Sequence, residues 1–354
     1  MNNSFWKNKK VLITGDTGFK GAWLTFCLYR AGAQIQGYSS SDFSENSKLY
    51  KKLKLNSISN TIDGDIRNQK AVMRAFNDFQ PEFVFHLAAQ PLVRYSYTDP
   101  VGTYDINIMG TINILEAIRN SKSIQSAVIV TTDKCYENNE WEFGYRETDP
   151  LGGHDPYSSS KGCAELVIKS YQKSFFNDQH NSPSVSSVRA GNVIGGGDFS
   201  KDRLIPDLFN SLTQKKELIL RNPYATRPWQ HVLEPLHGYI KVAETAYENK
   251  SLSNDCWNFG PLITDIRTVQ DVTELFCASW GGRNYIKHHA DKNNPHEAHS
   301  LSLDISKAFL KLDWHPKWNL KKAVLETVNW YKAYYEEKDM LGLTNEQIER
   351  YSSS

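Results

Sequence analysis

The sequence has few cysteines, almost no net charge and no long apolar run. Its five cysteines are widely spaced among 354 residues and never form a CxxC pair, which argues against a zinc site and favours a reducing cytoplasm. Lys and Arg number 41 against 40 Asp and Glu, so no polybasic footprint indicates nucleic acid. No apolar stretch reaches the roughly 20 residues that cross a membrane, and the N-terminus has no signal-peptide core. We therefore expect a cytoplasmic protein with no metal, nucleic-acid or membrane partner.

Short apolar runs alternate with helical stretches through the first half of the chain. Strands are predicted at residues 10–14, 34–38, 57–62, 82–87, 127–130 and 184–189, and a helix at residues 69–79. Strands and helices that alternate at this spacing are typical of an α/β protein with a Rossmann-like, doubly wound parallel sheet. Ligands of such folds bind at the carboxyl ends of the strands.

The regular alternation of strands and helices ends after Gly197. A helix at 203–212, a strand at 218–220 and a proline-rich stretch at 221–229 predict a smaller α+β lobe. We expect residues 1–195 to form the dinucleotide-binding domain and residues 196–345 the substrate-binding lobe, with the two interleaved at a shared cleft. Residues 319–335 are predicted as the final helix, and residues 347–354 as a frayed end.

A glycine-rich turn follows the first predicted strand. Residues 15–21 read Gly-Asp-Thr-Gly-Phe-Lys-Gly, and a helical stretch begins directly after them. Glycines let the backbone approach a pyrophosphate, and a helix N-terminus offers free N–H groups and the positive end of its dipole. The strand, turn and helix together predict a dinucleotide site, although the spacing is GxxGxxG instead of GxGxxG.

The end of the second strand bears on which dinucleotide binds. An acidic side chain there accepts a hydrogen bond from the ribose 2′-hydroxyl of NAD, whereas a nearby basic side chain accommodates the 2′-phosphate of NADP. Asp42 lies a few residues late and no Arg is close in the sequence, which favours NAD over NADP.

Tyr157 and Lys161 follow the strand at residues 127–130 and its Thr132. Residues four apart lie on one face of a helix, so the ammonium can sit near the phenol. A nearby cation favours the phenolate. Tyr157 is therefore interpreted as the proton acceptor for a substrate hydroxyl, with Lys161 lowering its pKa and Thr132 adding a hydrogen bond.

These motifs resemble the extended short-chain dehydrogenase/reductase superfamily, as does His-Leu-Ala-Ala at 86–89. Within it, the segments at 132–137, 152–161, 189–198 and 227–234 are similar to those of the CDP-glucose 4,6-dehydratase family. The resemblance implies a bacterial enzyme of dideoxyhexose and O-antigen biosynthesis, working as a homodimer or higher homo-oligomer with NAD. Its reaction would convert CDP-D-glucose to CDP-4-dehydro-6-deoxy-D-glucose by C4 oxidation, loss of water across C5 and C6, and hydride return to C6.

The elimination requires an acid at C6 and a base at C5. Asp133 is the expected acid, which would need a raised pKa. The next residue is Lys134, where the dTDP-glucose enzymes have a glutamate base. Lys134 would either take the C5 proton as a neutral amine or stabilise the enolate as a cation.

The resemblance also assigns binding residues. On the cofactor side they are Gly15, Thr17, Gly18, Phe19, Lys20, Gly21, Asp65, Ile66, Leu87, Ala88 and Ala89, with Tyr157 and Lys161. On the substrate side they are Asn192, Arg203, Arg227, His296 and Glu297. His154 and His231 fall in family motifs and are interpreted either as packed or as catalytic histidines.

Two other functions fit the same scaffold. A nucleotide-sugar 4-epimerase would use Tyr157, Lys161 and NAD in the same way but needs no acid for C6, so Asp133 argues against it. A non-catalytic NAD-binding regulator is the second alternative, because fold does not fix function. It would have less need of Thr132, Tyr157 and Lys161 together.

Overall fold

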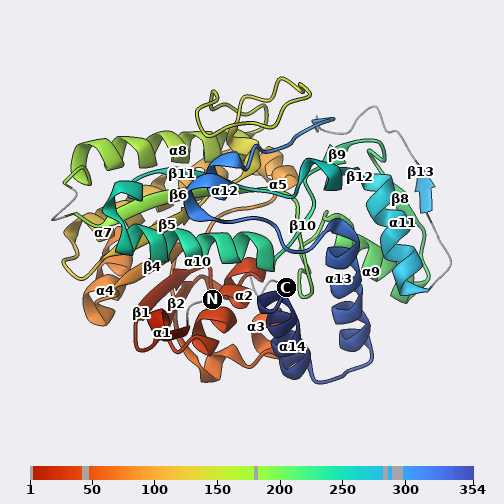
Figure 1. Cartoon of the computed structure of the whole chain (residues 1–354), viewed down its shortest axis with the longest axis horizontal. Coiled ribbons are helices and arrows are strands. Elements are labelled where there is room, and N and C mark those ends of the chain that lie inside the picture. The colour runs from red at the N-terminus through yellow and green to blue at the C-terminus, as the bar shows by residue number, and fades with distance from the viewer. Residues whose placement is uncertain (1–2, 42–47, 179–181, 282–285, 289–297) are drawn as a thin grey trace.

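The computed structural model describes residues 3–41, 48–178, 182–281, 286–288 and 298–354. Three residues named above, Asp42, His296 and Glu297, lie outside the described residues. Figure 1 shows a twisted sheet with helices on both of its faces and a smaller group of helices, including α9, α11 and α13, at one end.

The central sheet of the described chain has seven strands, all parallel, in the order β3-β2-β1-β4-β5-β6-β11. They are β1 Lys10–Thr14, β2 Gln34–Ser39, β3 Ser59–Asp63, β4 Phe83–His86, β5 Ser126–Val130, β6 Ser184–Ala190 and β11 Cys256–Phe259. The strand order reverses between β1 and β4, where doubly wound sheets open a crevice for a ligand. The predicted fold class is confirmed.

Helices cover both faces of the sheet because its strands are apolar on both sides. Val11 and Ile13 of β1 join one core cluster, while Leu12 between them joins the other. Such continuous apolar runs are typical of parallel strands buried on both faces. The helices are α1 Asn3–Trp6, α2 Phe19–Arg30, α3 Lys48–Lys52, α4 Gln69–Phe79, α5 Val93–Thr98, α6 Pro100–Tyr104, the π-helix η3 Asp105–Met109, α7 Gly110–Asn120, α8 Pro156–Phe175, α9 Leu204–Gln214, α10 Leu233–Glu248, α11 Val269–Trp280, α12 Ser306–Leu312, α13 Leu320–Tyr335 and α14 Met340–Ser352.

Short strand pairs build the remainder of the second half. They are β7 Val193–Ile194 with β10 Gln230–His231, β9 Thr226–Arg227 with β12 Arg267–Thr268, and β8 Leu218–Leu220 with β13 Ile286–His288. Strand β11, which also comes from beyond residue 195, is the edge strand of the large sheet. The domain boundary near residue 195 remains a prediction.

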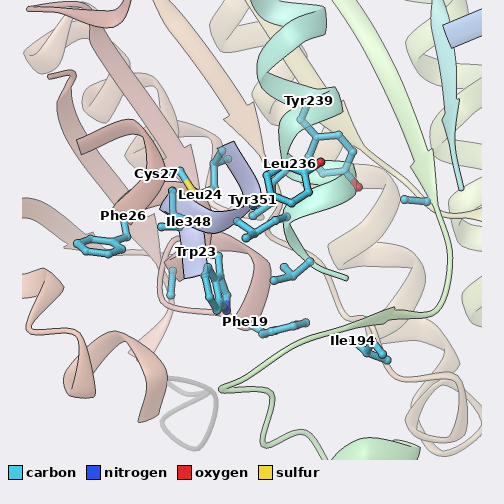
Figure 2. Packing of buried hydrophobic residues seen from close by; sticks show 14 of the residues in the cluster. Phe19, Trp23, Leu24, Phe26, Cys27, Ile194, Leu236, Tyr239, Ile348 and Tyr351 are labelled. Carbon is cyan, nitrogen blue, oxygen red and sulfur yellow. The ribbon is translucent and has the colours of Figure 1, made fainter. Parts of the chain in front are cut away.

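The C-terminal segment differs from the sequence-based expectation. Residues 319–335 are not the final helix, and residues 347–352 are not frayed, because α14 packs against α2 and α10 (Figure 2). The Tyr351 hydroxyl donates to Glu234 at 2.7 Å, and the Gln347 side-chain amide donates to the Glu326 carbonyl at 2.7 Å. These partners are distant in sequence, so the local pattern did not indicate them.

Short one-turn helices complete the described chain. They are η2 Leu55–Ser57, η4 Asp133–Cys135, η5 Lys250–Leu252 and η6 Ile263–Asp265. Of these, η4 begins three residues after the last residue of β5 and carries two of the predicted catalytic residues, so the carboxyl end of β5 determines where those side chains lie.

Candidate active site

A cavity of about 610 Å³ opens at the carboxyl ends of the sheet strands. All of the predicted cofactor, catalytic and substrate residues that the structure describes line it. They come from loops after β1, β3, β4, β5 and β6, from α8, and from the smaller lobe. Residues separated by more than 200 positions in the sequence therefore share one site.

The glycine turn forms one wall of this cavity. Gly15 has a φ of +73°, and a Cβ there would lie 2.7 Å from the Ala88 backbone nitrogen. A Cβ on Gly21 would lie 2.0 Å from the Gly15 carbonyl oxygen. Helix α2 begins at Phe19, and its N-cap residue Gly18 has no side chain to cap the first N–H groups. The turn thus leaves backbone donors at a helix N-terminus open to the cavity, which suits a phosphate.

Asp16 lies within the glycine turn and stabilises it through its buried side chain. The sequence analysis did not predict it as a site residue. It is fully buried, and it accepts hydrogen bonds from Ser39 and Thr61 at 2.6 Å each. Burial raises the pKa of its carboxyl group. Asp16 therefore ties the turn to the ends of β2 and β3.

The predicted adenosine side contains an arginine that the sequence analysis did not consider. Arg67 lines the cavity two residues after Asp65. Its guanidinium forms salt bridges with Asp65 and, at 3.6 Å, with Asp105. These two carboxylates compensate its charge, so Arg67 is not a free cation for a 2′-phosphate, and this end of the cavity fits NAD.

Asp133 lines the cavity with only 1% of its surface exposed. Its Oδ1 accepts a hydrogen bond from the Thr132 hydroxyl at 2.9 Å, while its buried Oδ2 has no hydrogen-bond partner among the described residues. A Cβ on Gly191 would lie 1.8 Å from that oxygen. The glycine makes room for the carboxyl group, because any side chain at position 191 would displace it.

Tyr157 and Lys161 project from the first turns of α8, beside Thr132. Tyr157 is hydrogen-bonded to Thr132, and burial raises the pKa of its phenol to about 12. The Lys161 ammonium donates to the Val130 carbonyl at 3.4 Å, and burial lowers its pKa to about 8. The pKa of Tyr157 is raised instead of lowered as expected, because burial outweighs the Thr132 hydrogen bond and the charge of Arg203.

A buried network lies beneath these residues. Glu165, one helical turn beyond Lys161, accepts hydrogen bonds from Thr131, from Ser187 at 2.8 Å and from Arg189 at 2.7 Å. Glu165 and Arg189 are each 3% exposed in their side chains. The Glu165 charge also raises the pKa of Lys161 against the effect of burial. The i,i+4 spacing from Lys161 could have indicated this residue, but nothing local indicated Arg189.

Lys134 and Lys20 also line the same cavity. Lys134 is partly exposed, and its backbone N–H donates to the Thr132 hydroxyl at 3.4 Å. Lys20 extends from the glycine turn to the Tyr239 hydroxyl at 3.4 Å, and burial together with the charge of Arg203 lowers its pKa to about 7. Both amines therefore lie within the cavity that holds Asp133.

The predicted substrate residues lie toward the smaller lobe. Asn192 follows β6 with a φ of +42°, a conformation that asparagine tolerates better than most residues. Arg227 is buried and donates to the carbonyl oxygens of Thr226 at 2.8 Å and His299 at 3.3 Å. Arg203 forms a 2.9 Å salt bridge with Asp198. Asp207 and Arg221 also line this end and were not predicted.

His154 and His231, the two histidines that fall in family motifs, are not among the described residues that line the cavity. His231 is fully buried between Trp23 and Trp318, and burial lowers its pKa to about 3. It is a packed core histidine, one of the two interpretations considered. His154 is exposed.

Three further properties describe the molecule. Among the described residues, no helix combines the length and apolarity needed to cross a membrane. The same residues contain no group of three or more His, Cys, Asp or Glu side chains placed to hold a metal ion. All five cysteines are free thiols.

The parallel sheet, the glycine turn and the Thr-Tyr-Lys arrangement define a dinucleotide-binding protein of the extended short-chain dehydrogenase/reductase class. The chain belongs to the GDP-mannose 4,6 dehydratase family, whose model matches residues 12–327. It is 46% identical to the CDP-glucose 4,6-dehydratase of Salmonella typhimurium, in an alignment that covers 100% of this chain and 99% of that protein.

Solved structures share the fold. A UDP-glucose 4-epimerase of Thermotoga maritima, solved with UDP-glucose, has a TM-score of 0.81 at 20% identity, covering 92% of this chain and 99% of that one. A dTDP-glucose 4,6-dehydratase of Bacillus anthracis, in complex with NAD, has a TM-score of 0.79 at 22% identity. The match covers 94% of this chain and 99% of that one. Because both an epimerase and a dehydratase match equally well, the fold alone does not distinguish these reactions.

Proposed function

We propose that this protein is an NAD-dependent dehydratase that converts CDP-D-glucose to CDP-4-dehydro-6-deoxy-D-glucose and water, for dideoxyhexose and O-antigen biosynthesis. The observation that carries the proposal is Asp133, a buried acid with an unpartnered oxygen beside Tyr157 and Thr132. Full-length similarity to a CDP-glucose 4,6-dehydratase supports it.

The cofactor side of the cavity fits NAD. The open donors at the α2 N-terminus would hold the pyrophosphate, and the cavity wall of Asp65, Ile66 and Leu87–Ala89 would enclose the adenosine and nicotinamide ends. Bound NAD would supply the acceptor and later the donor of hydride, and a positive charge that lowers the pKa of Tyr157.

Tyr157 would take the proton of the sugar C4 hydroxyl as C4 becomes a ketone. Thr132 is hydrogen-bonded to Tyr157 and would position the phenol for this transfer. Lys161, whose pKa is about 8, keeps its proton at neutral pH and would stabilise the phenolate. The C4 ketone then acidifies the C5 proton, which makes elimination at C6 possible.

Asp133 would protonate the departing C6 hydroxyl, so that it leaves as water. Its Oδ1 accepts a hydrogen bond from Thr132, and its buried Oδ2 has no hydrogen-bond partner among the described residues, so the Thr132 hydroxyl orients the carboxyl group at the cavity wall. An epimerase interconverts C4 configurations without this step. The buried acid therefore favours dehydration over epimerisation.

A substrate labelled with deuterium at C4 tests the reaction type. In the proposed reaction the deuterium moves from C4 to C6 of the same molecule, and the product has a 4-keto group. Mass spectrometry and NMR locate the label. Deuterium that stays at C4 while the C4 configuration changes would establish the epimerase instead, and unaltered substrate would favour the non-catalytic alternative.

Replacement of Lys134 by methionine is expected to slow exchange of the C5 hydrogen with solvent by about 10²-fold or more. Lys134 would either accept this proton or stabilise the enolate, and methionine can do neither. Incorporation of solvent deuterium at C5 measures the step. Lys201→Met, which removes an exposed lysine from the same cavity lining, should leave exchange unchanged; parental exchange in Lys134→Met would refute the role.

Replacement of Arg227 by alanine is expected to weaken CDP-glucose binding by about 10- to 100-fold, because a guanidinium bound to the substrate pyrophosphate is lost. NAD binding should change little. Titration calorimetry with each ligand measures both effects. Arg67→Ala, which removes a guanidinium from the predicted adenosine side of the cavity, should leave CDP-glucose binding unchanged. Equal losses for both ligands in Arg227→Ala would contradict the placement.

We also propose a cytoplasmic homodimer that forms through paired helices. Three exposed apolar side chains support this surface: Val101 on α6, Met109 on η3 and Leu166 on α8. Leu166→Glu should convert the dimer to a monomer, because it places a charge in an apolar interface. Light scattering coupled to size exclusion measures the mass. A parent protein that is monomeric at micromolar concentration would refute the dimer.

A further inference from the structure

The end of the cavity in the smaller lobe has the composition of a site for a flat heterocycle. It is lined by Leu204, Ile205 and Pro206 at the start of α9, by the strand β8, and by Val269 at the start of α11. Figure 1 shows α9, β8 and α11 together in this lobe. The same cavity is lined by Asn192 and Arg227, the proposed pyrophosphate ligands, so the nucleobase of the bound substrate would lie in this lobe.

Asp207, in the first turn of α9, lines this end of the cavity and is partly exposed. Its side chain has no hydrogen-bond partner within the described part of the chain. The other carboxylates of the cavity lining are engaged: Asp65 with Arg67, Asp99 with the Gly102 N–H, Asp133 with Thr132, Asp198 with Arg203, and Asp202 with Arg94 and Arg221. Asp207 is thus an acceptor without a donor.

We infer that Asp207 determines the choice of nucleobase by accepting a hydrogen bond from the 4-amino group of cytosine. This inference rests on the proposed function and deepens it. An ionised carboxylate only accepts hydrogen bonds, and the cytosine 4-amino group only donates them. Uracil and thymine present a 4-oxo acceptor at the same position, which a carboxylate repels. Selection therefore includes a penalty against the wrong base as well as a gain for the right one.

The electrostatic setting agrees with this geometry. Burial raises the pKa of Asp207 to about 6, with the charge of Arg221 acting in the opposite direction. A hydrogen-bond donor brought to the carboxylate would lower that pKa and offset the cost of burial. The carboxylate is mostly ionised at neutral pH, as acceptance from an amino group requires.

Base selectivity of Asp207→Asn tests the inference. An asparagine amide can donate to a 4-oxo group, so the ratio of kcat/KM for CDP-glucose to that for UDP-glucose should fall by about 10- to 100-fold. Asp202→Asn removes a carboxylate from the same lining that is already paired with arginines, and it should leave the ratio unchanged. An unchanged ratio in Asp207→Asn, or an equal fall in both variants, would overturn the inference.

A second measurement needs no substitution. CDP and its analogue with pyrimidin-2-one, which lacks only the 4-amino group, are titrated into the parent protein saturated with NAD. The analogue should bind about 10- to 100-fold more weakly; equal binding would overturn the inference. If the parent protein forms no 4-keto product from CDP-glucose, the proposed function itself is refuted. Failure of the base-selection inference and failure of the proposed function are therefore distinguishable.

Discussion

Replacement of Asp133 by asparagine is expected to lower the rate of water loss from the substrate by about 10²- to 10⁴-fold, the usual contribution of a positioned general acid. Asparagine has nearly the same shape and keeps a hydrogen-bond acceptor for the Thr132 hydroxyl. It cannot protonate the C6 hydroxyl as that group departs. The 4-ketoglucose nucleotide should therefore accumulate, and the C5 hydrogen should continue to exchange with solvent.

Rapid chemical quench with mass spectrometry measures the accumulated ketone and the final product separately. Asp202→Asn is the matched control, since it removes a carboxyl group from the same cavity lining and should leave the partition between ketone and product unchanged. Dehydration within about threefold of the parental rate in Asp133→Asn would show that another group protonates C6.

Replacement of Glu165 by glutamine is expected to lower the free energy of unfolding by about 3–5 kcal/mol, because it leaves the buried Arg189 guanidinium without a counter-charge. Side chains of both residues are only 3% exposed, so water does not compensate the lost charge. A loss of this size is a large part of the stability of a typical domain. Urea unfolding followed by circular dichroism measures it.

The double variant Glu165→Gln/Arg189→Met separates the two possible causes. If the unpaired guanidinium is responsible, removing it should recover most of the lost stability. Ser187→Ala, which removes one hydrogen bond to Glu165, should cost only about 1 kcal/mol. A double variant less stable than Glu165→Gln would mean that the hydrogen bonds around Glu165, and not its charge, stabilise the fold.

Local patterns in the sequence were sufficient to predict the glycine turn and every strand of the large sheet except β11. The glycine spacing of residues 15–21 follows directly after a buried strand, and Tyr157 and Lys161 are four residues apart on one helix. These signals act over a few residues, so they can be recognised without knowledge of the tertiary structure. The fold class was predicted for the same reason.

Features that depend on distant partners were not predicted. Helix α14 is fixed by Glu234 and Glu326, residues with no local relation to Tyr351 or Gln347. The buried Arg189 pairs with Glu165 across α8 and β6. The local sequence did not indicate a role for Asp207, because an acid in the first turn of a helix is ordinary. Only the tertiary structure shows that Asp207 lines the cavity without a hydrogen-bond partner among the described residues. The roles of the individual site residues remain predictions.

Incubation of the purified protein and NAD with CDP-, dTDP-, UDP- and GDP-glucose tests the central claim most directly. The alkaline ultraviolet absorbance of a 4-keto-6-deoxy sugar reports the product, and absorbance at the NADH wavelength reports net reduction. We expect the ketone from CDP-glucose alone, with no net NADH, because the hydride returns to the sugar. Interconversion of C4 epimers without any ketone would contradict the account and assign the protein as an epimerase.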